Sequence, residues 1–285
     1  MYEEKSEDLL NLFSPFSSYI TDRLMLKYLV FSALFLSGPL FGTPVGNTSA
    51  PQILEDGFFI SRNSWVDVRA GYEGDFVTNG RMEQQDSGRV DCYKQYTNSG
   101  TVTLNLLDRI DLYGVFGSSS TNADWRFTDL ENSVHRIEIQ TDRNFLWAAG
   151  GRAIFFEWGC ACLGLGGRYS WAKYDPEWVT NDGANAPSGN GEVRWSQWQI
   201  NLDISYKIEL FTPYIGTKYS SAQTILNGFP IPISSSGSGS NTFKNATPVG
   251  LYLGCTLSTG RYFMLNLEAR LIDEEAITVS GDFRF

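Results

Sequence analysis

The C-terminal segment, residues 275–285 (EAITVSGDFRF), alternates between apolar and polar side chains with a period of two. Such a period places the two sets on opposite faces of a β-strand. One set comprises Ile277, Val279, Gly281, Phe283 and Phe285, and the other comprises Ala276, Thr278, Ser280, Asp282 and Arg284. Two interpretations are open at this point. The segment is either an amphipathic edge strand of a soluble sheet or the closing strand of a transmembrane barrel, with aromatic side chains facing lipid.

The same alternation recurs along most of the chain from Trp65 onward. The expected strands cover residues 65–76, 89–97, 101–116, 123–129, 132–140, 144–157, 159–171, 197–208, 211–221, 248–258, 261–272 and 275–285. Residues 101–116 keep one phase and are interpreted as one long strand, with a hairpin turning at Leu107-Asp108 as the alternative. Residues 117–122 (GSSSTN) are expected to form a loop.

Short turns and long polar segments alternate between these strands. Tight turns are expected at residues 157–160, 208–211 and 258–260, and long loops at residues 78–88, 175–191 and 223–246. Outer-membrane barrels place short turns at the periplasmic end and long loops at the other end. The sequence therefore predicts an all-β fold, a transmembrane antiparallel β-barrel of about 12 strands, with 14 or 16 strands as alternatives.

The N-terminal region carries the one long apolar run, residues 28–41, which follows Lys27 and is followed by Gly42. A basic residue, an apolar run and a small residue are typical of a secretory signal peptide. We expect residues 25–42 to be the signal peptide, cleaved after Gly42, and residues 1–24 to be a misassigned start or an extension. Residues 43–63 would form an N-terminal lead and residues 64–285 the barrel. No apolar run near 18 residues follows Gly42, so no transmembrane helix is expected in residues 43–285.

Composition excludes several classes of function. The chain has 22 basic and 32 acidic residues, and nucleic-acid binding would favour a basic stripe. The single histidine, His135, has Ser133 and Glu131 nearby, but a hydrolase needs a nucleophile, a base and an orienting group that converge. We therefore expect no enzyme; a barrel enzyme acting on lipids is the minor alternative. The Cys160-Ala-Cys162 motif lacks further metal ligands nearby, so we expect no metal and no cofactor.

Parity along the strands assigns a set of charged side chains to the barrel interior. This set comprises Asp67, Arg69, Glu73, Asp75, Arg152, Arg168, Asp203, Lys207, Lys218, Glu268, Arg270, Asp282 and Arg284. Rings of charged side chains in a narrow pore select ions by sign, and these residues are the candidates for lining it. The alternative is that most of them form cross-strand ion pairs that hold the barrel together. Both signs are present, so the ion preference does not follow from the sequence. A barrel of this size has a narrow or plugged lumen.

The cysteines offer candidates for disulfide bonds, which export would permit. Cys160 and Cys162 share one face beside an expected periplasmic turn. Residues at positions i and i+2 of a strand lie too far apart for an easy mutual bond, so these two are better placed to reach another chain. Cys92 is the third candidate, and Cys255 is expected to act as a small apolar side chain.

Several segments resemble the chlamydial major outer membrane porin family. The resemblance is carried by residues 138–173, 195–222 and 267–285, which include FTPYIG, RLID and the terminal FRF. Residues 44–47 (PVGN), 71–76 (GYEGDF) and 105–117 are similar too. Members of that family are longer and richer in cysteine, with about 16 strands, so the chain resembles a short paralogue.

The resemblance implies a porin of the outer membrane that lets ions and small solutes diffuse, is often trimeric and strengthens the envelope through disulfide cross-links. Cys160 matches a family cysteine, whereas Trp158 stands where another is usual. The expected partners are outer-membrane lipid, the barrel-assembly machinery through Phe283 and Phe285, a homotrimer and disulfide-linked envelope proteins, without nucleic acid. The alternative function is a structural, surface-exposed envelope protein with little transport.

Overall fold

The computed structural model describes residues 44–58, 64–84, 88–235 and 237–285. The expected signal peptide and the residues before it lie outside this part of the chain. Strands dominate, and the described residues contain one short 3-10 helix, η1 (Ala50–Gln52).

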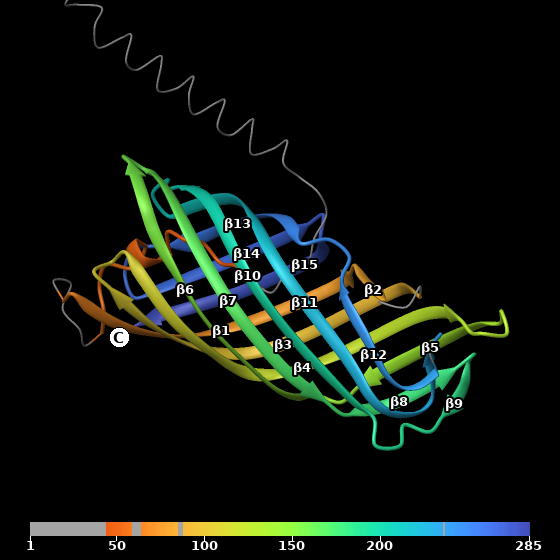
Figure 1. Ribbon diagram of the computed structural model, residues 1–285. Helices are drawn as coiled ribbons and strands as arrows, with labels where there is room; N and C mark the ends of the chain where they lie inside the picture. Colours follow the sequence, from red (N-terminus) through yellow and green to blue (C-terminus); the bar gives the residue numbers. More distant parts are fainter. Residues whose placement is uncertain (1–43, 59–63, 85–87, 236) are drawn as a thin grey trace, which may run out of the picture. The chain divides into compact units, whose positions relative to one another are not determined.

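Ten antiparallel strands of the described chain form a closed ring (Figure 1). Each strand pairs with its neighbour along the chain, and β1 closes the ring because it pairs with both β3 and β15. The ring strands are β1 (Val66–Gly80), β3 (Arg89–Leu106), β4 (Ile110–Thr128), β6 (Asn144–Trp158), β7 (Ala161–Tyr174), β10 (Glu192–Tyr206), β11 (Phe211–Ser234), β13 (Val249–Ser258), β14 (Phe263–Leu271) and β15 (Glu274–Arg284). The fold is thus a closed all-β barrel, but the expected count of about 12 strands is wrong.

Residues 101–116 contain a hairpin rather than one long strand. Leu107 and Asp108 have φ values of 57° and 51°, and tight hairpin turns need positive φ at both central residues. Leu106 pairs with Ile110 across this turn. Three residues separate the pair, so even-numbered side chains stay on the outer face of both strands. The single phase seen in the sequence therefore continues through a turn, and the interpretation as one strand is wrong.

The count falls because three expected strands become two: β3 covers residues 89–106, and β4 continues through residues 117–122, where a loop was expected. The inward-facing side chains there are polar but have partners inside the barrel. The Ser119 hydroxyl accepts hydrogen bonds from Thr97 at 3.0 Å and Tyr174 at 3.1 Å. Satisfied polar groups do not interrupt a strand. The separate strands expected at residues 89–97 and 123–129 are therefore parts of β3 and β4.

Five further strands lie at one end of the ring, here called the loop end (Figure 1). They are β2 (Met82–Gln84), β5 (Val134–Thr141), β8 (Pro176–Asn181), β9 (Ala184–Ala186) and β12 (Gly237–Asn245). The segments expected as long loops are thus largely strands, and the strand expected at residues 132–140 lies outside the ring as β5. The opposite end, here called the turn end, carries the short β3–β4, β6–β7, β10–β11 and β13–β14 turns.

The polarity of the two faces of the ring reverses along its strands. In β10, Trp195 faces inward at the loop end and is 3 % exposed, whereas Asp203 faces inward toward the turn end and is 2 % exposed. The outward-facing Arg194 is charged, whereas Ile200 and Leu202 further along are apolar and exposed. The loop end thus has the polarity of a soluble protein. The remainder of the ring has a polar inside and an apolar outside, as a membrane-spanning barrel does.

Exposed apolar side chains surround the ring below this reversal. They include Tyr72, Phe116, Leu165, Tyr169, Trp198, Ile200, Leu202, Ile215, Leu253, Leu267, Ile277, Phe283 and Phe285. Trp147 contacts Tyr169 and Trp198 contacts Tyr219, with ring centroids 5.7 and 5.5 Å apart. No helix within the described residues is long and apolar enough to cross a membrane.

Candidate functional site

Twelve of the thirteen charged side chains that parity assigned to the interior lie inside the ring. Ten are buried, and Arg152 and Asp282 are partly buried. Lys207 differs because it lies in the turn after β10, where its side chain is 45 % exposed and 3.6 Å from Glu55. This residue was expected inside and belongs to the turn-end rim.

One ion-pair network lies in the lumen near the turn end. Arg69 lies 3.3 Å from Asp67 and 3.5 Å from Asp111, and Arg152 also contacts Asp111 at 2.8 Å. Arg284 contacts Asp67 at 3.1 Å. Asp111 was missing from the sequence-based set, although its odd number along β4 gave the same parity signal as its neighbours.

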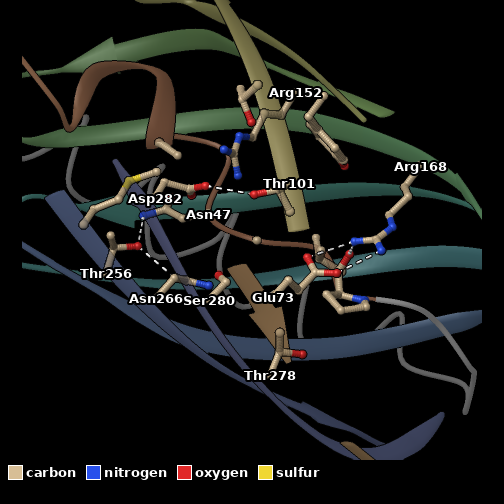
Figure 2. Close-up of a pocket in the computed structure, with 17 residues that line it drawn as sticks. Asn47, Glu73, Thr101, Arg152, Arg168, Thr256, Asn266, Thr278, Ser280 and Asp282 are labelled. Atoms are coloured by element: carbon tan, nitrogen blue, oxygen red, sulfur yellow. Dashed lines mark hydrogen bonds and ion pairs between the residues drawn. The ribbon is translucent and has the colours of Figure 1, made fainter. Parts of the chain in front are cut away.

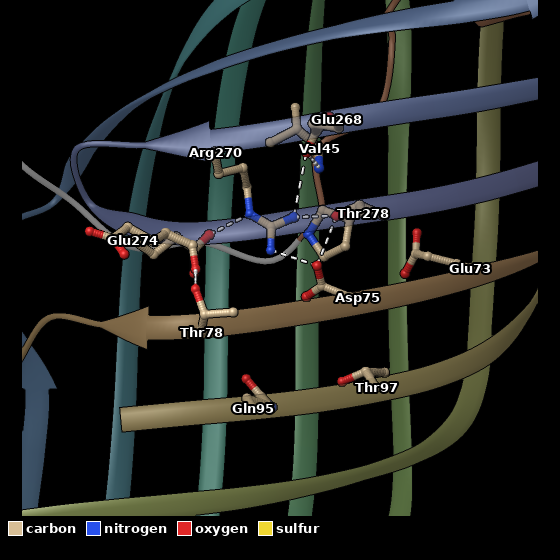
Figure 3. Close-up of polar contacts among 12 residues, drawn as sticks. Val45, Glu73, Asp75, Thr78, Gln95, Thr97, Glu268, Arg270, Glu274 and Thr278 are labelled. Atoms are coloured by element: carbon tan, nitrogen blue, oxygen red, sulfur yellow. Dashed lines mark hydrogen bonds and ion pairs between the residues drawn. The ribbon is translucent and has the colours of Figure 1, made fainter. Parts of the chain in front are cut away.

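A second network lies in the lumen toward the loop end (Figure 3). Arg270 points between Asp75, at 2.6 Å, and Glu268, at 3.5 Å, and it also contacts Glu274. Lys218 contacts Glu274 at 2.8 Å and Asp273 at 2.7 Å. Asp273 and Glu274 escaped the sequence reasoning because they sit at the β14–β15 turn, which folds inward.

A polar cavity of about 50 Å³ lies in the lumen between the two networks (Figure 2). Arg168 forms a bidentate pair with Glu73, with distances of 2.9 and 3.0 Å, on one side of it. Thr101 donates a hydrogen bond to Asp282 at 3.2 Å on the other side. Its volume suits water molecules or a very small solute.

The N-terminal lead, residues 44–56, occupies much of the remaining polar lumen. It contacts inward-facing side chains of seven strands: β1, β3, β7, β10, β13, β14 and β15. Val45, Asn47 and Leu54 are at most 6 % exposed. The sequence shows no regular period in this segment, and nothing in it predicted a place inside the barrel.

An apolar core lies inside the barrel at the loop end. Its members come from the ring strands and from the additional strands: Met82, Tyr93, Trp125, Phe127, Ile137, Ile139, Leu146, Ala172, Tyr174, Val179, Val193, Trp195, Leu226, Phe229, Ile233 and Phe243. The Ile233 carbonyl accepts hydrogen bonds from Trp125 Nε1 and Asn241 Nδ2, both at 3.0 Å. The end of β11 is thereby held over this core.

The four cysteines are all free. Cys160 is exposed in the β6–β7 turn, whereas Cys92, Cys162 and Cys255 are partly buried. Cys162 points toward the lead, with its Sγ 3.9 Å from Gln52 Oε1. A partner chain for Cys160 thus stays a prediction, and Cys162 has a neighbour within its own chain. No group of three or more His, Cys, Asp or Glu side chains in the described ranges could hold a metal ion.

His135 lies at the loop end, outside the ring. Its Nδ1 is 2.8 Å from Asp182 and its Nε2 is 3.1 Å from Asp129. These two carboxylates raise the pKa of His135, because both hydrogen-bond to the protonated ring. Within the described chain, the groups on the ring nitrogens are therefore carboxylates rather than Ser133 or Glu131. A ring held at both nitrogens is poorly placed to activate a serine.

The chain is similar in sequence to known proteins. The family model described as Chlamydia major outer membrane protein matches residues 104–182. The chain is 25 % identical over 394 residues to the major outer membrane porin, serovar B, of Chlamydia trachomatis, covering 92 % of this chain and 100 % of the relative. It is 26 % identical over 388 residues to the major outer membrane porin of Chlamydia pneumoniae, covering 92 % and 99 %. Both alignments are longer than the 285-residue chain, so the relatives carry segments that it lacks.

Among solved structures, an outer membrane channel from Pseudomonas putida F1 gives a TM-score of 0.40 at 10 % identity, covering 78 % of this chain and 96 % of that one. The outer membrane protein OprG from Pseudomonas aeruginosa gives 0.37 at 9 % identity, covering 81 % and 99 %. Both likenesses are distant, and the assignment rests on the sequence matches. Those matches place the protein in the outer membrane. The chain is similar to the Chlamydia major outer membrane protein family, over residues 104–182 by the family model and over 92 % of its length by the porin relatives.

Proposed function

We propose that this protein is an outer-membrane porin that lets ions and small polar solutes cross through the barrel lumen. The observation that carries the proposal is the polar, charged inner face of the ring inside an apolar outer face. A water-filled path needs a polar inner face, and contact with membrane lipid needs an apolar outer face. The relatives named as porins support the same role, which is transport rather than catalysis.

The inward-facing charges are proposed to line the path, with Lys207 at its rim. Glu73 and Arg168 face the central cavity, and their bidentate pair leaves little net charge there. The ring also contains paired charges of both signs at other levels. We therefore expect weak ion selectivity, in which a single unpaired charge has a visible effect.

A filled interior supports a second candidate, a structural envelope protein with little transport. The lead occupies the polar lumen and the apolar core occupies the loop end. On this candidate, disulfide links to other envelope proteins through Cys160, Cys162 or Cys92 would matter more than conductance. Non-reducing gels of outer membranes test it, with Cys160→Ser as the first variant because Cys160 is exposed.

The lipid-facing and C-terminal features suggest further partners. Outer-membrane lipid fits the exposed apolar band. Phe283 and Phe285 are exposed on that band, and we propose that they are the signal read by the barrel-assembly machinery. A homotrimer is proposed from the resemblance to the family alone.

Single-channel recording tests the porin function. Refolded residues 43–285 in a planar bilayer should give discrete conductance steps, and a salt gradient should give a reversal potential near zero. Glu73→Gln would leave Arg168 unpaired and should shift the reversal potential toward anion preference. Glu209→Gln, at an exposed turn-end position, is the matched control and should leave it unchanged. A folded protein that never conducts would instead favour the structural candidate.

A further inference from the structure

We propose that the N-terminal lead, residues 44–56, is a displaceable plug that closes the lumen, and that its release toward the turn end is required for conduction. The inference rests on the proposed porin function, because a plug regulates only a path that exists. It is carried by how the lead is held, by the space left for it and by the position of its attachment.

Charged side chains of the lumen wall hold the lead through hydrogen bonds. Its first part donates hydrogen bonds to carboxylates: the Val45 and Gly46 amides to Glu268, at 3.1 and 2.8 Å, and the Thr48 amide to Asp203, at 3.2 Å. The Thr48 hydroxyl also donates to Asp203. These two carboxylates come from β14 and β10, so the lead bridges different strands of the wall.

The second part of the lead accepts hydrogen bonds from cations. Arg69 donates to the carbonyls of Ala50 and Pro51, both at 3.0 Å, and Arg284 donates to the carbonyl of Leu54. These contacts engage the backbone of the lead rather than charged side chains. The wall therefore binds the uncharged residues 44–54 largely through their backbone, with amides toward the carboxylates and carbonyls toward the guanidiniums.

The wall also provides room for the lead. A Cβ atom at Gly164 of β7 would lie 2.1 Å from Thr48 Oγ1 and 3.0 Å from the Ala153 carbonyl oxygen. Heavy atoms cannot approach that closely, so a side chain at Gly164 would compete with the lead for its place. Gly167 on the same strand differs, because its nearest neighbour would be the Gln199 carbonyl oxygen at 3.4 Å.

The lead can leave without breaking the ring. From residue 44 to Ile53, the backbone–backbone hydrogen bonds of the lead join its own residues to one another. The lead adds no strand to the barrel. Its attachment lies at the turn end, where the Glu55 amide donates to the Gly260 carbonyl at 2.8 Å and Phe58 stacks on Tyr262 at 4.6 Å. A swing about this attachment would carry the lead out of the turn end without crossing the apolar core.

A disulfide lock tests the plug, because Cys162 Sγ already lies 3.9 Å from Gln52 Oε1. The variant is Gln52→Cys in the full-length protein carrying Cys160→Ser, processed and refolded in lipid. We expect the Cys162 bond to form under mild oxidation, conductance steps to be absent in the oxidised protein, and steps to appear after reduction. The matched control adds Cys162→Ser, which cannot lock, and should conduct equally with and without reductant.

A second pair of variants tests the equilibrium between the lead inside the lumen and the lead outside it, without an engineered disulfide. Gly164→Ala should crowd Thr48 and raise the fraction of time that the channel is open at least several-fold. Gly167→Ala, on the same strand, should leave the open fraction unchanged. Both are compared with the unmodified protein by single-channel recording, with folding verified by migration of the unheated protein on gels.

The outcomes separate the plug from the porin function. Failure of the Cys162 bond to form would overturn the placement of the lead in the lumen. A bond that forms while the oxidised and reduced proteins conduct equally would overturn the plug and leave the porin function standing. Silence of every variant, reduced or oxidised, would overturn the porin function and the gating role together.

Discussion

Inward-facing side chains at the loop end, such as Trp195, are apolar, whereas those nearer the turn end, such as Asp203, are charged, although both belong to β10. The outer faces show the reverse, with Arg194 exposed at the loop end and Ile200 exposed further along. One strand thus serves two environments. Water surrounds the loop end and lipid surrounds the remainder, and the face that meets the surrounding phase changes its polarity accordingly.

The two regions are stabilised by different interactions. The loop end buries a contiguous apolar core, whose free energy follows from removing apolar surface from water. The polar region buries ion pairs and hydrogen bonds. Removing one partner of a buried ion pair is destabilising, because the other charge stays buried without compensation. Substitutions should therefore act by volume at the loop end and by charge near the turn end.

The largest expected effect is that of Arg270→Met in the polar region. Its guanidinium contacts Asp75, Glu268 and Glu274, and is fully buried. Removing one partner of a buried ionic network costs roughly 3–5 kcal/mol, because the remaining charges stay buried without compensation. Urea unfolding in lipid vesicles measures this loss. Arg194→Met, which removes an exposed arginine, should have almost no effect; equal losses would show that burial of the charge does not matter.

A volume change at the loop end should have the next largest effect. Leu146→Ala removes a side chain that is 2 % exposed in the apolar core, and such a deletion costs about 2–5 kcal/mol. Leu165→Ala on the lipid-facing side should cost much less, since lipid chains can fill the space. The same unfolding assay compares the two. A larger loss for Leu165 would contradict the assignment of the two faces.

The smallest expected effect concerns pH at the loop end. Because the pKa of His135 is raised, the protonated ring between Asp129 and Asp182 stabilises the β5–β8 region. This stabilisation is fully present below about pH 6.5, the ordinary pKa of a histidine. This contribution is lost as the pH rises through the raised pKa. Hydrogen exchange of β5 and β8 should therefore become faster from about pH 5 to about pH 9 beyond its intrinsic increase. In His135→Gln this excess should vanish; an unchanged excess would exclude the histidine as its cause.

The odd or even position of residues along the strands predicted much of the fold from the sequence alone. Within the ring strands below the polarity reversal, odd or even position separated wall-facing charges such as Arg69 and Arg284 from lipid-facing side chains such as Phe283. Lys207 is an exception because β10 ends one residue before it. Parity works there because each residue of a strand has only two directions to face. It failed to separate β3 from β4, since the turn at Leu107-Asp108 preserves the phase.

The loop end could not be predicted in the same way. Polar, glycine-rich and proline-containing segments such as residues 223–246 have the composition of loops, yet β11 extends through Ser234 and pairs with β12. Partners distant in sequence hold these segments, as when Trp125 and Asn241 bind the Ile233 carbonyl. Local pattern does not report such contacts.

The lead was also beyond sequence reasoning. Residues 44–56 carry two charged side chains, Glu55 and Asp56, and no period, because their backbone rather than their side chains makes most of the contacts to the wall. Only the packing of the complete ring creates the arrangement of Glu268, Asp203 and Arg69 that fits this peptide. The candidate site therefore combines a predictable wall with an occupant that the sequence pattern did not indicate.

Amide hydrogen exchange of the lead tests most directly whether the polar lumen is filled by the protein's own N-terminal segment. The measurement compares Val45, Gly46 and Thr48 with amides of the ring strands in refolded residues 43–285. We expect these three amides to exchange far more slowly than in a free peptide, because Glu268 and Asp203 accept their hydrogen bonds inside the barrel. Exchange at the rate of a free peptide would contradict the account and would leave an open polar lumen below the apolar core.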